Sequence, residues 1–158
     1  MSAPARGELD ASDLRIGVVR SLFNQRVTDG LLRGATEVLN EAGAHDVTMI
    51  DVEGAFEVPL IARRLVSKGC DAVIALGAVI EGETDHYDHI AERTSEGLMR
   101  VMLDTGVPIA FGILTVTDPD HAIARSAPCE KNKGREAASA AIRTANLLKQ
   151  TRDLRPET

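Results

Sequence analysis

The chain has 158 residues, of which 44% are hydrophobic and 27% are charged, and this length and composition predict one globular domain with a packed core rather than a disordered chain. Its 24 acidic residues outnumber its 18 Lys and Arg, which gives a formal net charge of -6 and argues against nucleic acid as the main partner, because phosphate backbones bind surplus basic residues. Two cysteines in a chain of this length, Cys70 and Cys129, form no CxxC pair and argue against a disulfide framework.

The amino-terminal segment lacks the apolar stretch that is typical of a signal peptide. The longest apolar run, residues 72–80, is about half of the ~18 residues that cross a bilayer. We therefore expect a cytoplasmic protein without a membrane anchor. One domain is expected to span residues 13–150, between flexible tails at residues 1–12 and 151–158.

Four β-rich apolar runs follow in chain order, at residues 14–23, 47–52, 71–80 and 107–116. The third and fourth runs are apolar at nearly every position rather than at alternate positions. This pattern is typical of strands that are covered on both faces, as in a parallel sheet.

Helical patterns separate these runs, and three of them, at residues 27–43, 58–69 and 85–106, end in a glycine that can close a helix. Two more helices are expected at residues 118–127 and 135–150, the second favoured by its Ala and Leu content. The alternation predicts an α/β fold with a doubly wound parallel sheet and right-handed crossovers. Because four strands make a small sheet, we expect further apolar surface to be buried between subunits.

The loops that follow the strands are the place to look for a site, because ligands of an open parallel sheet bind outside the carboxyl ends of its strands. The chain has only three Phe, one Tyr and no Trp. Phe23, Phe56 and Tyr87 nevertheless fall in or just past such ends, and Phe111 lies within the fourth strand. Each can be a packing residue at the rim, but together they favour a flat ligand that stacks on an aromatic face.

The loop after the third strand reads EGETDH, at residues 81–86. Gly82 permits tight backbone geometry, and the N–H groups of Glu83 and Thr84 are expected to point out of the first turn of the next helix, where the macrodipole favours an anion. The loop is therefore a candidate phosphate seat, although Thr84 or Asp85 could instead simply cap the helix.

A cation is needed near this loop, because its acidic side chains would repel a phosphate. Arg125 and Lys133 are the candidates, and the guanidinium of an arginine offers a bidentate fork to phosphate. Either residue could instead be an ordinary solvated side chain.

His86, at the end of the same loop, can exchange protons at neutral pH and is the candidate proton carrier. His86 and His89 together with Asp85 also raise the alternative of a metal site. Their spacing is not that of an HExxH motif, and such clusters also arise by chance on a solvated helix face.

Five separated motifs resemble those of the lumazine synthase family, an enzyme family of riboflavin biosynthesis, and they follow one order between residues 16 and 148. The motifs are SLFN at 21–24, GAFEVPL at 54–60, ALGAVIEGETDHYDHIA at 75–91, GVPIAFGILT at 106–115, and ARS through NKG at 124–134. The resemblance implies a flavodoxin-like three-layer sandwich around a four-stranded parallel sheet, assembled as a pentamer or as a 60-subunit icosahedral shell.

The resemblance also implies a reaction. It is the condensation of 5-amino-6-(D-ribitylamino)uracil with 3,4-dihydroxy-2-butanone 4-phosphate, which gives 6,7-dimethyl-8-ribityllumazine, phosphate and water. The family requires no metal or organic cofactor. A riboflavin synthase, which takes the product, is the implied partner besides further copies of the chain.

Site residues are implied position by position. Those that would bind the ribityl-uracil are Phe23, Ala55, Phe56, Glu57, Val79 and Ile80. Phe23 would stack on the pyrimidine ring, and Glu57 would accept hydrogen bonds from the ribityl hydroxyls. The backbone groups of Val79 and Ile80 would read the uracil edge.

The second substrate has its own implied set. Backbone N–H groups of Gly82, Glu83 and Thr84 would seat its phosphate, and His86 would move protons as the catalytic residue. A neighbouring subunit would supply Phe111, Arg125 and Lys133, with Arg125 on the phosphate.

The chain departs from the family pattern at three places: Glu81 stands where Arg is frequent, Asp85 replaces a more neutral residue beside the histidine, and APCEKNKG at 127–134 differs from the usual loop. Nearby carboxylates favour the imidazolium and weaken phosphate binding. Two other functions remain open from the residues alone: a non-catalytic flavin- or lumazine-binding shell, and a metal-dependent hydrolase using His86, His89 and Asp85.

Overall fold

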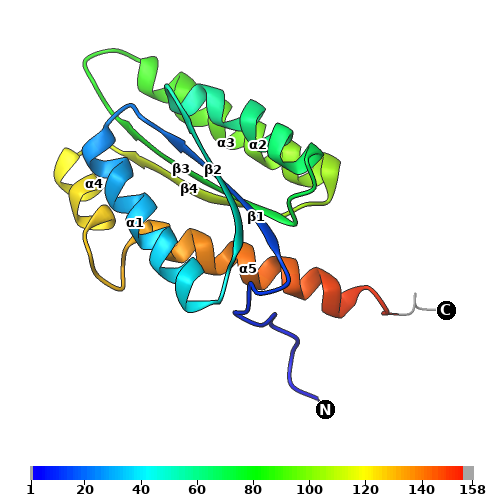
Figure 1. The fold of residues 1–158 in the computed structure, drawn as a ribbon. Helices are drawn as coiled ribbons and strands as arrows, with labels where there is room; N and C mark the ends of the chain where they lie inside the picture. The colour runs from blue at the N-terminus through cyan, green and yellow to red at the C-terminus, as the bar shows by residue number, and fades with distance from the viewer. Residues whose placement is uncertain (1, 155–158) are drawn as a thin grey trace.

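A computed structural model describes residues 2–154, in which strands and helices alternate along the chain (Figure 1). The strands are β1 (Arg15–Ser21), β2 (Asp46–Val52), β3 (Ala72–Ile80) and β4 (Ile109–Val116). The helices are α1 (Gln25–Glu41), α2 (Val58–Ser67), α3 (His86–Thr105), α4 (Pro119–Ser126) and α5 (Lys133–Thr151), with a short 3₁₀ helix, η1 (Ala55–Glu57), before α2. Every strand and helix expected from the sequence is confirmed, with ends that shift by one or two residues.

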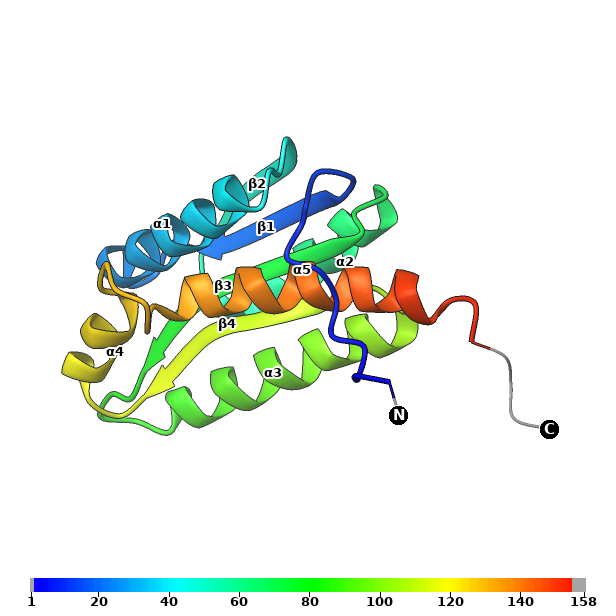
Figure 2. The same cartoon turned by 90° about the horizontal axis from the view of Figure 1, so that it is seen from below.

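All four strands are parallel and lie in the order β2-β1-β3-β4. From β1 the chain moves outward to β2 and then returns to the other side of β1 to form β3, so the winding direction reverses between β1 and β3. Helices α2 and α3 cover one face of the sheet, and α1, α4 and α5 cover the other (Figures 1 and 2). The predicted doubly wound three-layer sandwich is therefore confirmed.

Two hydrophobic clusters, one on each face of the sheet, form the core. Leu31 of α1 and Ile142 of α5 pack with Ile74 on one face, and Val58 and Leu65 of α2 pack with the opposite side of β3 on the other. Burial on both faces explains why β3 is apolar without alternation, and only its last residue is not fully buried.

Cover on both faces was also expected for β4, and this expectation is wrong, because β4 is an edge strand that is only partly covered. Phe111 is 51% exposed, and Thr115 on the same strand is also exposed. An apolar run alone cannot distinguish a strand covered by its own chain from one whose edge remains open. The open edge of β4 becomes important for the site.

Three helices end as the glycine positions predict. Gly43, Gly69 and Gly106 have φ of 75, 99 and 71°, the left-handed backbone that a glycine adopts without the penalty of a Cβ. These turns fix where each chain segment leaves its helix and enters the next strand.

The amino-terminal segment crosses over α5 (Figure 2). The Asn146 side-chain amide donates hydrogen bonds of 2.8 Å to the carbonyls of both Glu8 and Asp10, and Ala11 is fully buried. The flexibility expected of residues 1–12 and 151–158 stays a prediction, and residues 1 and 155–158 lie outside the described part of the chain.

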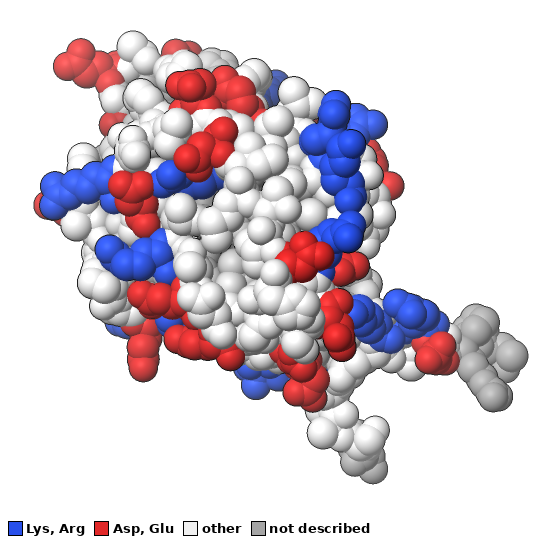
Figure 3. All heavy atoms as spheres, in the orientation of Figure 1, with Lys and Arg blue, Asp and Glu red and all other residues white. Residues whose placement is uncertain are grey.

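Acidic and basic side chains surround an uncharged centre on the face seen in Figure 3. Both signs are interspersed around the rim of that face, in keeping with the modest net charge. Within residues 2–154, no helix combines the length and the hydropathy that crossing a membrane requires.

Candidate active site

A cavity of about 670 Å³ opens at the carboxyl ends of the strands, where the winding direction reverses. We call it the switch-point cavity. The residues predicted from the sequence that line it are Phe23, Ala55, Phe56, Glu57, Val79, Ile80, Gly82, Thr84 and His86. Ligands of doubly wound sheets bind at this position.

The turn from β1 into α1 presents Phe23 to this cavity. Asn24 has a φ of 61°, a left-handed conformation that asparagine tolerates better than most residues. Its side-chain amide donates a 3.1 Å hydrogen bond to the carbonyl of Ala78 in β3, and the Phe23 N–H donates to the carbonyl of Glu53 at 3.0 Å. The turn is thereby tied to the ends of three strands, while the Phe23 ring stays 71% exposed and free to stack.

A cluster of charged side chains stabilises the strands and the helix next to this turn. Arg20 of β1 has a side chain that is only 9% exposed, and it donates to both carboxylate oxygens of Asp51 in β2, at 2.9 and 3.0 Å, and also to Asp29 of α1. The hydrogen bond from Arg20 holds the pKa of Asp51 below its ordinary value, and the same bond raises the pKa of Arg20. The cluster ties β1, β2 and α1 together three residues before Phe23.

The segment after β2 forms a second wall of the switch-point cavity. Gly54 precedes η1 in an extended conformation, Ala55 is buried, and the ring of Phe56 is 60% exposed. Glu57 is exposed and lines the cavity. The buried Ala55 thus anchors the segment, and the two exposed residues that follow it turn an aromatic ring and a carboxylate toward the opening.

The loop after β3 forms the rim on the third side. Gly82, Glu83, Thr84 and His86 are all exposed, and Gly82, Thr84 and His86 line the cavity, whereas Glu83 does not. The hydroxyl of Thr84 accepts a 3.3 Å hydrogen bond from the N–H of His86, the first residue of α3, although Thr84 itself lies one position before the N-cap.

One expectation for this loop is wrong. Helix α3 begins at His86 with Asp85 as its N-cap residue, so the N–H groups of Glu83 and Thr84 precede the first turn instead of pointing out of it. Neither group donates a hydrogen bond to another of residues 2–154. Both N–H groups are therefore free to donate a hydrogen bond to an anion, but they lie outside the first turn, where the helix macrodipole favours an anion.

Asp85 is oriented toward His89 rather than toward His86. The Oδ2 atom of Asp85 lies 3.3 Å from Nε2 of His89, one turn along α3. Within the described residues, no group of three or more His, Cys, Asp or Glu side chains is placed to hold a metal ion. The three residues considered for a metal site therefore form an exposed pair beside a separate histidine.

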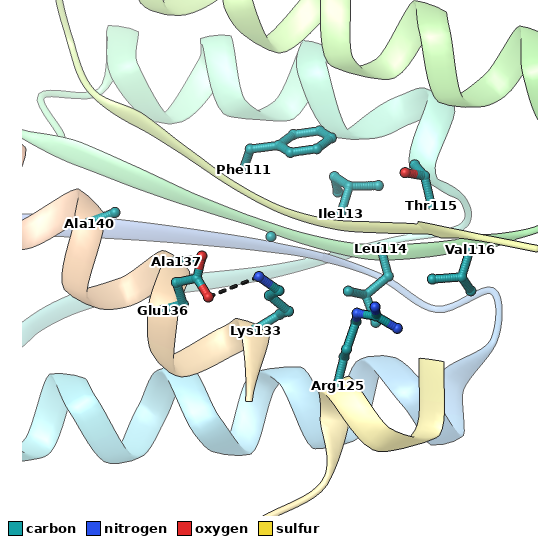
Figure 4. A pocket seen from close by; sticks show the side chains of 11 residues that line it. Phe111, Ile113, Leu114, Thr115, Val116, Arg125, Lys133, Glu136, Ala137 and Ala140 are labelled. Atoms are coloured by element: carbon teal, nitrogen blue, oxygen red, sulfur yellow. Dashed lines mark hydrogen bonds and ion pairs between the residues drawn. The ribbon is translucent and has the colours of Figure 1, made fainter. Parts of the chain in front are cut away.

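A second cavity, of about 380 Å³, lies along the open edge of β4 and is lined by Phe111, Arg125 and Lys133. We call it the edge cavity. Figure 4 shows Arg125 at the end of α4 and Lys133 at the start of α5, both directed toward the strand. The ammonium of Lys133 donates a 2.9 Å hydrogen bond to Glu136, and the guanidinium of Arg125 donates to the carbonyl of His121 at 3.2 Å.

The two cavities have no lining residue in common. The switch-point cavity offers aromatic rings, free backbone N–H groups, a histidine and carboxylates, but none of its lining residues is Lys or Arg. The edge cavity offers two cations and an aromatic ring. The cations and the free backbone N–H groups thus lie on two separate surfaces of the chain.

Two residues that contact the predicted site residues were not expected to belong to it. Asn24 directly follows Phe23, and its preference for left-handed turns was the available signal. Glu136 lies three residues after Lys133, a spacing that brings helix side chains together. Tyr87 was noted for its position, and it lines the switch-point cavity.

Comparison with known proteins gives consistent results. A family model described as 6,7-dimethyl-8-ribityllumazine synthase matches residues 13–149. A 6,7-dimethyl-8-ribityllumazine synthase of Thermococcus kodakarensis is 43% identical over 148 residues, covering 93% of this chain and 94% of the relative. One of Streptomyces coelicolor is 39% identical over 149 residues, covering 93% of this chain and 92% of the relative.

Proposed function

The chain belongs to the 6,7-dimethyl-8-ribityllumazine synthase family of transferases in riboflavin biosynthesis, and from this premise we propose how its own residues divide the work. The two substrates are 5-amino-6-(D-ribitylamino)uracil and 3,4-dihydroxy-2-butanone 4-phosphate. The switch-point cavity of one subunit binds the first, and the edge cavity of a neighbouring subunit completes the site for the second. The observation that carries the proposal is that the cations and the cavity with the free N–H groups lie on surfaces of one chain that share no lining residue.

The ribityl-uracil half of the proposal concerns the first cavity. Phe23 stacks on the pyrimidine ring, and Glu57 accepts hydrogen bonds from the ribityl hydroxyls beside Ala55 and Phe56. Backbone groups at Val79 and Ile80 read the uracil edge. The exposed ring of Phe23 supports this assignment, because an aromatic side chain left 71% exposed gains from burial against a flat ligand.

The phosphate half joins two subunits. Backbone N–H groups of Gly82, Glu83 and Thr84 seat the phosphate, and Arg125 of the neighbour supplies the cation, supported by Lys133. Two observations favour this: the N–H groups of Glu83 and Thr84 have no partner among residues 2–154, and the first cavity has no cation among its lining residues. A charge-assisted bond to phosphate is roughly twice as strong as a neutral one.

The chemistry needs proton transfers at several steps. The exocyclic amine of the uracil attacks the ketone, and water is lost to give an imine. Removal of the proton from the neighbouring carbon expels phosphate and leaves an enol, which tautomerises to a ketone. The ribityl-bearing nitrogen attacks this carbonyl and closes the second ring with loss of a second water. His86 accepts and returns protons in these steps, a contribution of about 10²–10⁴ in rate. Holding both substrates in register supplies much of the remainder.

This arrangement requires an assembly in which β4 of one subunit faces the switch-point cavity of another. A closed ring built from one repeated heterologous contact satisfies the requirement. We propose a pentamer, alone or as part of a 60-subunit shell, that hands its product to a riboflavin synthase. A cytoplasmic location suits the exposed, unpaired thiol of Cys129.

Substitution of Arg125 tests the phosphate assignment. Arg125→Ala removes a charged hydrogen bond, worth about 1.5–3 kcal/mol, so KM for the butanone phosphate should rise about 10- to 100-fold, while KM for the ribityl-uracil changes little. Steady-state kinetics with each substrate varied in turn measures both. An unchanged KM for the butanone phosphate would reject the role of Arg125, and absence of any fluorescent lumazine from the unaltered chain would reject the synthase.

A further inference from the structure

The connection between α4 and α5 has a single fully buried polar side chain, that of Asn132. The segment between the helices, residues 128–131, is exposed throughout. Asn132 is only 1% exposed, and a buried amide is costly unless its hydrogen-bonding groups are satisfied. The Asn132 side chain therefore needs hydrogen-bond partners within the protein, whereas the exposed side chains of the connection can bond to water.

All the hydrogen-bonding capacity of this amide is used. Nδ2 of Asn132 donates to the carbonyl of Gly30 in α1 at 3.1 Å and to that of Ala127 at 2.9 Å. Oδ1 accepts from the N–H of Gly134 at 2.8 Å and from that of Arg135 at 3.2 Å. One side chain thus joins the end of α4, the start of α5 and the middle of α1.

Helix α1 is shaped to receive this connection. A Cβ on Gly34 would lie 2.1 Å from Oδ1 of Asn132, and a Cβ on Gly30 would lie 2.3 Å from the carbonyl oxygen of Ser126. Both distances are far below van der Waals contact, so only glycine fits. The amide of Asn132 thus holds the connection between α4 and α5 against α1.

The positions that the amide fixes are those next to the two cations of the edge cavity. Ala127 directly follows α4, whose last turn carries Arg125, and Lys133 directly follows Asn132 as the first residue of α5. Both cations point to the same stretch of β4 (Figure 4). The amide of Asn132 therefore ties together the backbone next to both cations, which the exposed residues between them do not do.

We propose that Asn132 is a positioning residue for the Arg125–Lys133 pair, an inference that rests on the proposed role of this pair in binding the phosphorylated substrate. It acts through main-chain hydrogen bonds to Gly30 and Ala127 and touches no substrate. Exact placement matters, because a displacement of about 1 Å in a binding group can cost on the order of 10²-fold in rate.

The test uses Asn132→Asp, which keeps the size of the side chain and the two accepted bonds but removes the donors to Gly30 and Ala127. Asn132→Ser, which keeps a capping oxygen, is the second variant. Asn146→Ser is the matched control. Asn146 of α5 also donates to two main-chain carbonyls, but these belong to Glu8 and Asp10 of the amino-terminal segment and not to residues beside the two cations.

Either Asn132 variant should raise KM for the butanone phosphate by about tenfold, the loss expected for a weakened charged hydrogen bond. Inhibition by orthophosphate should weaken in parallel, whereas KM for the ribityl-uracil should stay within about twofold of its value in the unaltered chain. In Asn146→Ser, the KM values for both substrates should stay within about twofold. Equal changes in both KM values, or a change in kcat alone, would show that Asn132 serves only the fold and would overturn the proposal.

Arg125→Ala separates this inference from the proposed function. If Arg125→Ala itself leaves KM for the butanone phosphate unchanged, the role of the cation pair fails, and the positioning role fails with it. If Arg125→Ala raises that KM but neither Asn132 variant does, only the positioning role fails. In the double variant Arg125→Ala/Asn132→Asp, an effect smaller than the product of the two single effects supports the proposal, and a full product contradicts it.

Discussion

Mixed assemblies of two defective chains should recover activity if the active site is shared between subunits. His86→Ala damages only the switch-point cavity and Arg125→Ala only the edge cavity, because the cavities have no residue in common. In an assembly from equal amounts of both chains, a site is intact when its first cavity comes from an Arg125→Ala chain and its second from a His86→Ala chain. Each condition holds for about half of the positions, so about one quarter of the sites should be intact.

Coexpression of the two chains with different tags, followed by a lumazine fluorescence assay at low butanone phosphate, measures this recovery. Each variant assembled alone should retain at most about a tenth of the normal rate, given the losses expected for a missing proton carrier and a missing phosphate ligand. The mixture should reach about a quarter of the normal rate. A rate equal to the mean of the two separate variants would refute the shared site.

A second mixture provides the control. The unaltered chain mixed equally with the double variant His86→Ala/Arg125→Ala should also show about one quarter of the sites intact if two chains form each site. It should show about one half if one chain forms the whole site. The two mixtures therefore distinguish a shared site from subunit exchange or partial assembly.

Two further predictions concern the framework of the site. Gly34→Ala places a Cβ 2.1 Å from Oδ1 of Asn132 and should destabilise the fold by about 1–3 kcal/mol, seen as a lower Tm in calorimetry; an unchanged Tm would mean that α1 is not closely packed there. Asp51→Asn should lower the stability to urea at pH 7, because the hydrogen bond from Arg20 depresses the pKa of Asp51 in the folded state below 3.8, its ordinary value. A carboxylate with a depressed pKa stabilises the fold above its unfolded pKa and loses that contribution as the pH falls through its folded pKa. The difference in the free energy of unfolding between the unaltered chain and Asp51→Asn should therefore become smaller in acid. A difference that stays constant from pH 7 to pH 3 would contradict this role of Asp51.

The sequence predicts the fold well where local pattern and topology agree. The uninterrupted apolar run of β3 requires cover on both faces, and the glycines after α1, α2 and α3 all adopt the left-handed turns that their positions suggest. Because ligands bind at the carboxyl ends of parallel strands, the same pattern led to Phe23, Phe56 and His86, which line one cavity.

Local pattern fails where the answer depends on a distant part of the chain. The apolar run of β4 looks like that of β3, but whether its edge is covered depends on the strand order and on what lies beyond it, so the exposure of Phe111 could not be predicted from the run itself. Asn132 lies in a polar connection, and its burial depends on Gly30 and Gly34, about a hundred residues earlier.

These two failures have a common physical origin, which bears on how the site works. Arg125 and Lys133 flank an exposed connection, residues 128–131, whose own side chains do not set the distance between them. In the proposal above, the buried amide of Asn132, packed against the glycines of α1, sets that distance. The edge strand beside them is left uncovered by its own chain. Exposure of an open apolar edge is unfavourable for an isolated subunit, whereas the two cations beside it can stay solvated. In the proposed function a neighbour covers this edge and brings the phosphate to the cations, which is why the separation of the two cavities argues for a site completed by assembly.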